Sequence, residues 1–203
     1  MSDDTQEVQY RDPKAEKIPD FGSIANFMWR RANYMLQDAV KSNAKIRVLD
    51  PCAGGGLLLA QANKGFELVA YENDYESFWY CAPFLTAKGF VVNNSYTNGC
   101  FESHFADPFG PEFNLVISIP YTDRQINGKY ETDPSYLKIG NYAFYVMARS
   151  MDVLLDKGIG VFCVPLEYRE KKYQEQVDYL LTKADILSIE SYGDVAIAVL
   201  QKK

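Results

Sequence analysis

Short apolar runs alternate with helical patterns through most of the chain. The runs are IRVL, ELVAY, FVV (90–92), LVIS (115–118) and GVFCVP (160–165). Between them, apolar residues recur at three- and four-residue steps at 57–63, 74–88 and 142–156, as is typical of amphipathic helices. Strands that alternate with helices predict a parallel sheet with crossover connections. Because the strands are continuously apolar, we expect both faces of the sheet to be covered.

The N-terminal part divides into a charged arm and a helix. Residues 1–20 carry nine charged side chains and almost no large apolar ones, so we expect a mobile arm before a single folded domain over 21–203. Ser23 is expected to cap the helix that follows. The apolar positions of this helix have helical spacing and predict a core-facing side: Ile24, Phe27, Met28, Ala32, Met35 and Ala39.

The last two apolar runs, at 186–191 and 195–200, are separated only by the residues YGD. A link of this length joins antiparallel neighbours and is too short to hold a crossover helix. We therefore predict an α/β fold with a seven-stranded, mostly parallel sheet, an antiparallel last strand and helices on both faces.

Composition narrows the classes of function. The chain has 203 residues, 47% of them hydrophobic, which is enough for one core of ordinary size. Its 21 Lys and Arg against 27 Asp and Glu give a net charge of −6, so the overall field does not attract a polyanion. Four distant cysteines and one histidine predict neither a zinc site nor a disulfide framework. Because membrane-spanning and signal-peptide patterns are absent from the sequence, we expect a soluble, cytoplasmic protein.

The first candidate site is the glycine-rich segment VLDPCAGGG, which follows the first expected strand. Adjacent glycines let the chain turn sharply with positive φ, so that a ligand can lie against the backbone where a helix begins. A turn that serves only packing would have the same sequence. The candidate cofactor-binding residues here are Asp50, Pro51, Cys52, Ala53, Gly54 and Gly56.

An acidic residue follows the second expected strand. Glu72 lies 16 residues after Gly56, at the place where a βαβ unit binds the two hydroxyls of a ribose. The neighbouring Asn73 is a second candidate at this strand end. The GxGxxG spacing that cradles a pyrophosphate is missing, which favours a nucleoside ligand without a pyrophosphate. A solvated carboxylate at a strand end is the alternative interpretation of Glu72.

The segment FNLVISIPY contains the second candidate site. Ser118, Ile119, Pro120 and Tyr121 follow the fourth expected strand at its carboxyl end, the edge where open α/β sheets bind ligands. Together with DPCAGGG and Glu72, this segment resembles the class I S-adenosylmethionine-dependent methyltransferases that modify amino nitrogens. The segment 141–165 resembles the helix and fifth strand that follow this motif in adenine-N6 DNA methyltransferases.

The resemblance implies S-adenosylmethionine as cofactor, no metal, and a role for each residue of the second site. An exocyclic amine is a poor nucleophile, because its lone pair is delocalised into the ring, so the site must hold it facing the methyl group. Ser118, which also counts among the cofactor-binding residues, would accept an N–H bond from the amine through Oγ. The carbonyl of Ile119 or Pro120 would accept another, and Tyr121 would stack on a flipped-out base.

This chain departs from the adenine-N6 pattern at two motifs. Ser118 stands where Asn or Asp is usual and is more typical of cytosine-N4 enzymes, and Ile119 replaces the common Pro, as in ribosomal RNA adenine dimethyltransferases. The family often has an acidic residue after the third strand for the cofactor adenine, whereas this chain reads VVNNSYTNG. Asn94 or Ser95 is the substitute there. Adenine N6, in DNA before RNA, stays the first expectation from the resemblance. These departures leave the target base open.

We expect a partner subunit or complex to contribute to substrate binding. The resemblance implies a nucleic-acid base as acceptor, yet the net charge is −6 and no separate target-recognition region is recognised, so a partner subunit is expected. The segment 122–140, or the helix that bears Arg30 and Arg31, is a candidate docking surface, although either is equally well an ordinary solvated surface. Two alternatives stay open: a protein amide methyltransferase, and a catalytically weak cofactor-binding subunit with a structural role.

Overall fold

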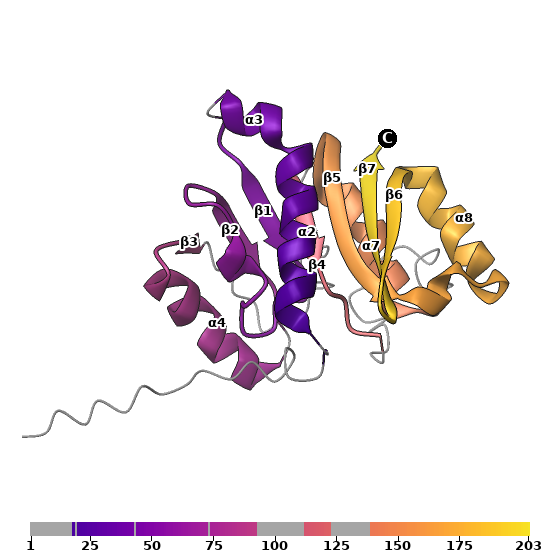
Figure 1. Cartoon of the computed structure of the whole chain (residues 1–203), viewed down its shortest axis with the longest axis horizontal. Coiled ribbons are helices and arrows are strands. Elements are labelled where there is room, and N and C mark those ends of the chain that lie inside the picture. The colour runs from indigo at the N-terminus through magenta and orange to yellow at the C-terminus, as the bar shows by residue number, and fades with distance from the viewer. Residues whose placement is uncertain (1–17, 19, 43, 73, 93–111, 123–138) are drawn as a thin grey trace, which may run out of the picture.

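The structure, a computed structural model, describes residues 18, 20–42, 44–72, 74–92, 112–122 and 139–203. Within these residues seven strands form one sheet, in the order β3-β2-β1-β4-β5-β7-β6 (Figure 1). Neighbouring strands are parallel from β3 to β5, and β7 is antiparallel to both β5 and β6. The predicted mixed sheet is therefore confirmed. The strands are β1 (Arg47–Asp50), β2 (Glu67–Ala70), β3 (Val91–Val92), β4 (Phe113–Ser118), β5 (Leu154–Pro165), β6 (Ala184–Tyr192) and β7 (Val195–Lys202).

Helices cover both faces of this sheet, as the apolar strands predict. In Figure 1, α2 crosses in front of the central strands and α7 lies behind the sheet. The helix α4 connects β2 to β3, and α8 lies between β5 and β6 in the chain and packs against α7. The α-helices are α2 (Phe21–Met35), α3 (Gln37–Lys41), α4 (Tyr75–Ala87), α7 (Tyr142–Val153) and α8 (Gln174–Lys183), and the short 3-10 helices are η1 (Leu59–Gln61), η3 (Leu166–Arg169) and η4 (Lys171–Tyr173).

Successive residues of the central strands belong to different cores. In β1, Val48 packs in the core that includes α2, whereas Leu49 packs in the core that includes α7. Val161 and Phe162 of β5 divide in the same way. All four side chains are 0% exposed, which explains why these strands carry no polar alternation.

The helix predicted over 57–63 is wrong. Only the three-residue 3-10 helix η1 forms there, so the glycine turn does not lead into an α-helix. The physical reason is tertiary: Leu58 and Leu59 are 2% and 0% exposed, and the Leu58 carbonyl accepts a hydrogen bond from the Trp29 indole at 2.7 Å. A segment of this length also lacks the residues to offset helix nucleation.

The start of the first helix also differs from the prediction. Ser23 does not cap it, because α2 begins at Phe21, with Asp20 at the N-cap position and no side-chain capping bond. Phe21 packs against the core, so the helix begins three residues earlier than a Ser23 cap would place it, and Tyr192 donates a hydrogen bond to Asp20 at 3.2 Å. Most of the expected arm, residues 1–17 and 19, lies outside the described residues.

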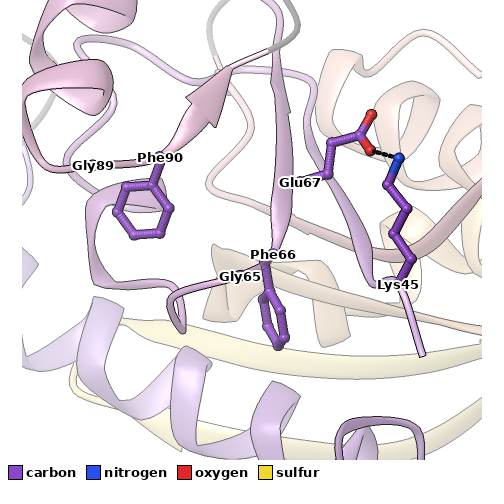
Figure 2. Close-up of a pocket in the computed structure, with 6 residues that line it drawn as sticks. All are labelled: Lys45, Gly65, Phe66, Glu67, Gly89 and Phe90. Atoms are coloured by element: carbon purple, nitrogen blue, oxygen red, sulfur yellow. Dashed lines mark ion pairs between the residues drawn. The ribbon is translucent and has the colours of Figure 1, made fainter. Parts of the chain in front are cut away.

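The amino ends of β1, β2 and β3 border a pocket of about 320 Å³ (Figure 2). The rings of Phe66 and Phe90 line it, together with Gly65 and Gly89, and the ion pair between Lys45 and Glu67 closes one side. Open α/β sheets bind their ligands at the opposite, carboxyl edge. We therefore attribute this pocket to packing between strand ends.

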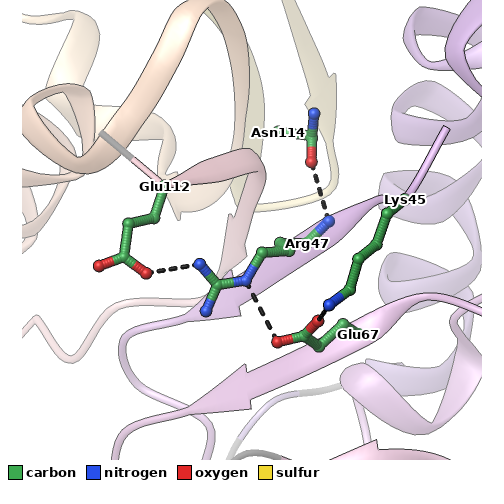
Figure 3. Close-up of polar contacts among 5 residues, drawn as sticks. All are labelled: Lys45, Arg47, Glu67, Glu112 and Asn114. Carbon is green, nitrogen blue, oxygen red and sulfur yellow. Dashed lines mark hydrogen bonds and ion pairs between the residues drawn. The ribbon is translucent and has the colours of Figure 1, made fainter. Parts of the chain in front are cut away.

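A charged network joins β1 to its two neighbours at the same amino edge (Figure 3). Arg47 donates to Glu67 of β2 at 3.2 Å and to Glu112, next to β4, at 2.5 Å. Its backbone N–H donates to the Asn114 side chain at 2.8 Å, and Lys45 pairs with the other oxygen of Glu67. Because the Glu67 side chain is only 10% exposed, its two cationic partners compensate a charge that is largely removed from water.

The close packing of the glycine turn against α4 gives a stability prediction. Gly56 has φ +89°, and a Cβ there would lie 3.0 Å from Cys81 Sγ and 3.2 Å from Leu85 Cγ. Gly65 has φ +93° with nothing within 4 Å of its Cβ position, so Gly65→Ala is the matched control. We expect Gly65→Ala to lower the free energy of unfolding by about 1–2 kcal/mol through backbone strain. Gly56→Ala should cost roughly a further 1–3 kcal/mol through overpacking, measured by urea denaturation. Equal losses would contradict this contact.

Candidate functional site

Three strand ends bring the predicted site residues together. Asp50 and Ser118 are the last residues of β1 and β4, and Glu72 follows β2 by two residues. Because the order in the sheet is β2-β1-β4, these three residues lie at neighbouring carboxyl ends. Tyr121 extends from the same edge, three residues after β4 ends. Hydrogen bonds link the residues in two groups, one around Asp50 and one around Glu72.

The Asp50 carboxylate joins β1 to β4. Its Oδ1 accepts a hydrogen bond from Ser118 Oγ at 2.7 Å and one from the Cys52 backbone N–H at 3.0 Å. Asp50 is 1% exposed and Ser118 is 0% exposed. The pair therefore fixes the direction in which the chain leaves β1. A hydroxyl that donates one bond still has lone pairs, so the bond to Asp50 does not itself exclude the acceptor role expected of Ser118, which stays a prediction for a side chain that is fully buried.

The Glu72 carboxylate holds the glycine turn and the start of α4. Its Oε2 accepts from the Gly54 backbone N–H at 2.6 Å, and its Oε1 accepts from the Asp74 backbone N–H at 2.7 Å. Asp74 in turn caps α4 by accepting from the Ser77 N–H at 2.8 Å. Glu72 is 8% exposed, so it is a buried, hydrogen-bonded group and the solvated strand-end interpretation is wrong.

Tyr121 reaches across the strand ends to Glu72. Its hydroxyl donates to Glu72 Oε2 at 2.8 Å. Burial, followed by the charge of Glu72, raises the pKa of the Tyr121 phenol well above its ordinary value. The phenol is therefore a hydrogen-bond donor throughout the neutral pH range and does not act as a base.

The backbone of the glycine turn adopts a conformation that suits glycine. Gly54 and Gly56 have φ values of +56° and +89°. Two backbone bonds hold the turn: the Ala53 N–H donates to the Tyr71 carbonyl at 2.9 Å, and the Gly56 N–H donates to the Ala53 carbonyl at 3.0 Å. The whole stretch from Pro51 to Gly56 is buried. The positive φ predicted from the three glycines is confirmed at two of them.

The remaining motif residues are less accessible than their expected roles suggest. Ile119 is 7% exposed and packs in the core that includes α2, and Pro120 is also buried. Their side chains therefore support the segment, and their carbonyl groups are the parts that the resemblance assigns to the amine. The positions Asn73, Asn94, Ser95 and 123–138 lie outside the described residues, so their predicted roles stay predictions.

Two contacts between residues far apart in the chain were not predicted from the sequence. One is the hydrogen bond between Tyr121 and Glu72, which are 49 residues apart in the chain. The other is an exchange of hydrogen bonds between Asn141, the N-cap of α7, and the Tyr168 hydroxyl, at 2.9 and 3.2 Å. The first requires β2, β1 and β4 to be neighbours in the sheet, and the second requires α7 to pack against the segment that follows β5, which local patterns do not specify.

The two arginines of the candidate docking surface on α2 contact other side chains of this chain. Arg31 pairs with Glu190, and the Arg30 guanidinium lies over the Phe27 ring. Among the described residues, no group of three or more His, Cys, Asp or Glu side chains could hold a metal ion. In the same part of the chain, no helix has both the length and the apolar character needed to cross a membrane.

Solved structures share this fold. No protein-family model and no curated protein sequence matches the chain. A proposed class I S-adenosylmethionine-dependent methyltransferase of Listeria monocytogenes superposes with a TM-score of 0.68 and 14% identity, over 89% of this chain and 59% of that one.

Two further structures are similar over most of both chains. The N-methyltransferase NodS of Bradyrhizobium japonicum, solved with S-adenosyl-L-homocysteine, has a TM-score of 0.60 and 10% identity, over 97% of this chain and 94% of that one. A ribosomal protein L11 methylase of Lactobacillus delbrueckii has a TM-score of 0.58 and 16% identity, over 90% and 78%. The seven-stranded sheet described above is thus the class I methyltransferase fold.

Proposed function

We propose that this chain is an S-adenosylmethionine-dependent methyltransferase that acts on an exocyclic amino nitrogen of a nucleic-acid base, adenine N6 first and DNA before RNA. The observation that carries the proposal is the convergence of Asp50, Glu72, Ser118 and Tyr121 at one edge of the sheet. Two of them are buried carboxylates that backbone N–H groups orient. An edge of this kind binds a nucleoside and a second reactant side by side.

The residues present fit the proposed cofactor. Glu72 presents a carboxylate at the end of β2, where a ribose diol is recognised, and its orientation is fixed by two backbone N–H groups. Beside it, Gly54 of the glycine turn has no Cβ atom, so a ligand can approach the backbone closely at this residue, whereas the space at Gly56 is taken up by α4. We assign the nucleoside to Glu72 and the methionine end to this turn.

In the transfer itself, the chain positions the reactants. The bound cofactor supplies a sulfonium methyl group, which is reactive without help from the protein. Ser118 Oγ and a carbonyl of the Ile119–Pro120 segment accept the N–H bonds of the amine and direct its lone pair. The Tyr121 ring stacks on the planar acceptor. The proton leaves to solvent after transfer, so the reaction requires no dedicated base.

A protein substrate is the second candidate. The fold is shared with a ribosomal protein L11 methylase, so the fold itself does not separate a protein acceptor from a base. The motif favours the base, because an aromatic residue after Ser-Ile-Pro offers a stacking surface to a ring. A protein amide would need a smaller, hydrogen-bonding pocket.

The charge of the chain bears on how nucleic acid is held. The net charge is −6, and the two arginines of α2 that could contact phosphate are engaged with Glu190 and Phe27. Phosphate contacts normally provide the sequence-independent part of affinity. We therefore propose that a partner with a basic surface supplies them.

Cofactor binding tests the role of Glu72. Glu72→Gln should weaken S-adenosyl-L-homocysteine binding by about ten- to a hundredfold, because hydrogen bonds to a charged acceptor contribute roughly 1.5–3 kcal/mol. Glu67→Gln is the matched control, since Glu67 lies at the other end of β2 and is also 8% exposed. Titration calorimetry measures both. Unchanged affinity in Glu72→Gln would remove this residue from the site.

Turnover tests the second motif. Pro120→Ala and Tyr121→Ala should each lower methyl transfer by at least about tenfold without weakening cofactor binding, because these residues are assigned to the acceptor. Initial rates with labelled cofactor, titration calorimetry and melting temperatures separate the possibilities. A joint collapse of cofactor binding and melting temperature would mean that the segment only supports the fold.

Nucleic-acid binding tests the need for a partner. The purified chain should bind short single- and double-stranded DNA and RNA only weakly, with dissociation constants above about 1 μM at low salt, because its charge repels phosphate. Fluorescence anisotropy measures this. Submicromolar binding by the chain alone would contradict the partner, whereas tighter binding in the presence of a co-purifying basic subunit would support it.

A further inference from the structure

Tyr121 and the proposed ribose are directed at the same carboxylate, that of Glu72. Glu72 Oε2 accepts from the Gly54 N–H at 2.6 Å and from the Tyr121 hydroxyl at 2.8 Å. A carboxylate oxygen has two lone pairs, so these two bonds use its capacity. A ribose hydroxyl that binds Oε2 must therefore replace one of the two donors.

The two donors differ in how easily they can move. The Gly54 N–H belongs to a buried turn whose neighbours are fixed by the bonds from Ala53 to Tyr71 and from Gly56 to Ala53. Tyr121 lies beyond the end of β4, is only partly buried, and needs a side-chain rotation to leave Glu72. The tyrosine is thus the donor that a ribose hydroxyl would displace.

We infer that the Tyr121 hydroxyl competes with the cofactor ribose for Glu72, so that cofactor binding releases the Tyr121 ring to receive the acceptor. This inference rests on the proposed function and adds an order of events to it. Cofactor binds first, because the stacking surface for the base becomes available when Tyr121 leaves Glu72. By linkage, the hydrogen bond that Tyr121 gives up lowers the apparent affinity for the cofactor.

The sign of the change in cofactor affinity, when the Tyr121 hydroxyl is removed, shows whether Tyr121 competes with the cofactor or binds it. If Tyr121 competes, removing its hydroxyl strengthens cofactor binding; if Tyr121 instead held the cofactor, the same change would weaken it. Tyr121→Phe removes the hydroxyl and keeps the ring. Tyr192→Phe is the matched control, because Tyr192 also donates to a carboxylate, that of Asp20. Tyr192 is the last residue of β6, which is an edge strand separated from β2 by four other strands.

Titration calorimetry of the full chain with S-adenosyl-L-homocysteine tests the inference. We expect Tyr121→Phe to bind about two- to tenfold more tightly than the wild type, as the loss of one competing hydrogen bond implies. Tyr192→Phe should bind like the wild type. Tyr121→Leu, which also lacks the hydroxyl, should show the same direction and serves if the phenylalanine variant does not fold.

Two nucleosides that differ only in their ribose hydroxyls test whether these hydroxyls are the groups that compete with Tyr121. Tyr121→Phe should strengthen the binding of adenosine and leave that of 2′,3′-dideoxyadenosine unchanged. Equal or weaker S-adenosyl-L-homocysteine binding by the variant, or an equal gain for both nucleosides, would overturn the competition and leave the proposed function in place. Absence of S-adenosyl-L-homocysteine binding by the wild-type chain would instead overturn the proposed function, and the competition with it.

Discussion

Two buried carboxylates, Asp50 and Glu72, hold the carboxyl edge of the sheet together. Asp50 accepts from a backbone N–H and a serine hydroxyl, and Glu72 accepts from two backbone N–H groups and a phenol. These five donors belong to β4 and to the segments that follow β1, β2 and β4. Burying a carboxylate is favourable only when it is well hydrogen-bonded. The glycine turn, the start of α4 and the motif after β4 are therefore fixed relative to one another by the same two side chains that are assigned to ligand binding.

A buried glutamate lies near each end of β2, and the two glutamates have different partners. At the amino edge, Glu67 is compensated by the cations Lys45 and Arg47, and the result is a closed ion network between strands (Figure 3). At the carboxyl edge, Glu72 accepts hydrogen bonds from two backbone N–H groups and a phenol, which are neutral groups. Neutral donors orient a carboxylate without cancelling its charge. These contacts agree with the recognition role that we propose for Glu72.

The sequence predicted the features that depend on local pattern. The strands, the cover on both faces and the antiparallel end follow from apolar periodicity and from the short link before β7, which in the structure is Gly193 and Asp194. The wrong prediction at 57–63 has a tertiary cause, since the Trp29 indole donates to the Leu58 carbonyl and both Leu58 and Leu59 are buried. Candidate residues were found because they follow strands directly. The contact of Tyr121 with Glu72 was not, because it requires β2, β1 and β4 to be neighbours.

The central claim is that this edge transfers a methyl group to the amino nitrogen of a base. The most direct measurement supplies cofactor with a labelled methyl group to the complex in which the chain purifies, together with unmethylated DNA, RNA or protein. Nucleic acid is then digested to nucleosides, and the position of the label is identified by mass spectrometry. The account predicts label on an exocyclic amine, with N6-methyladenine as the main product. Label confined to protein, or no transfer while S-adenosyl-L-homocysteine binds, would contradict it.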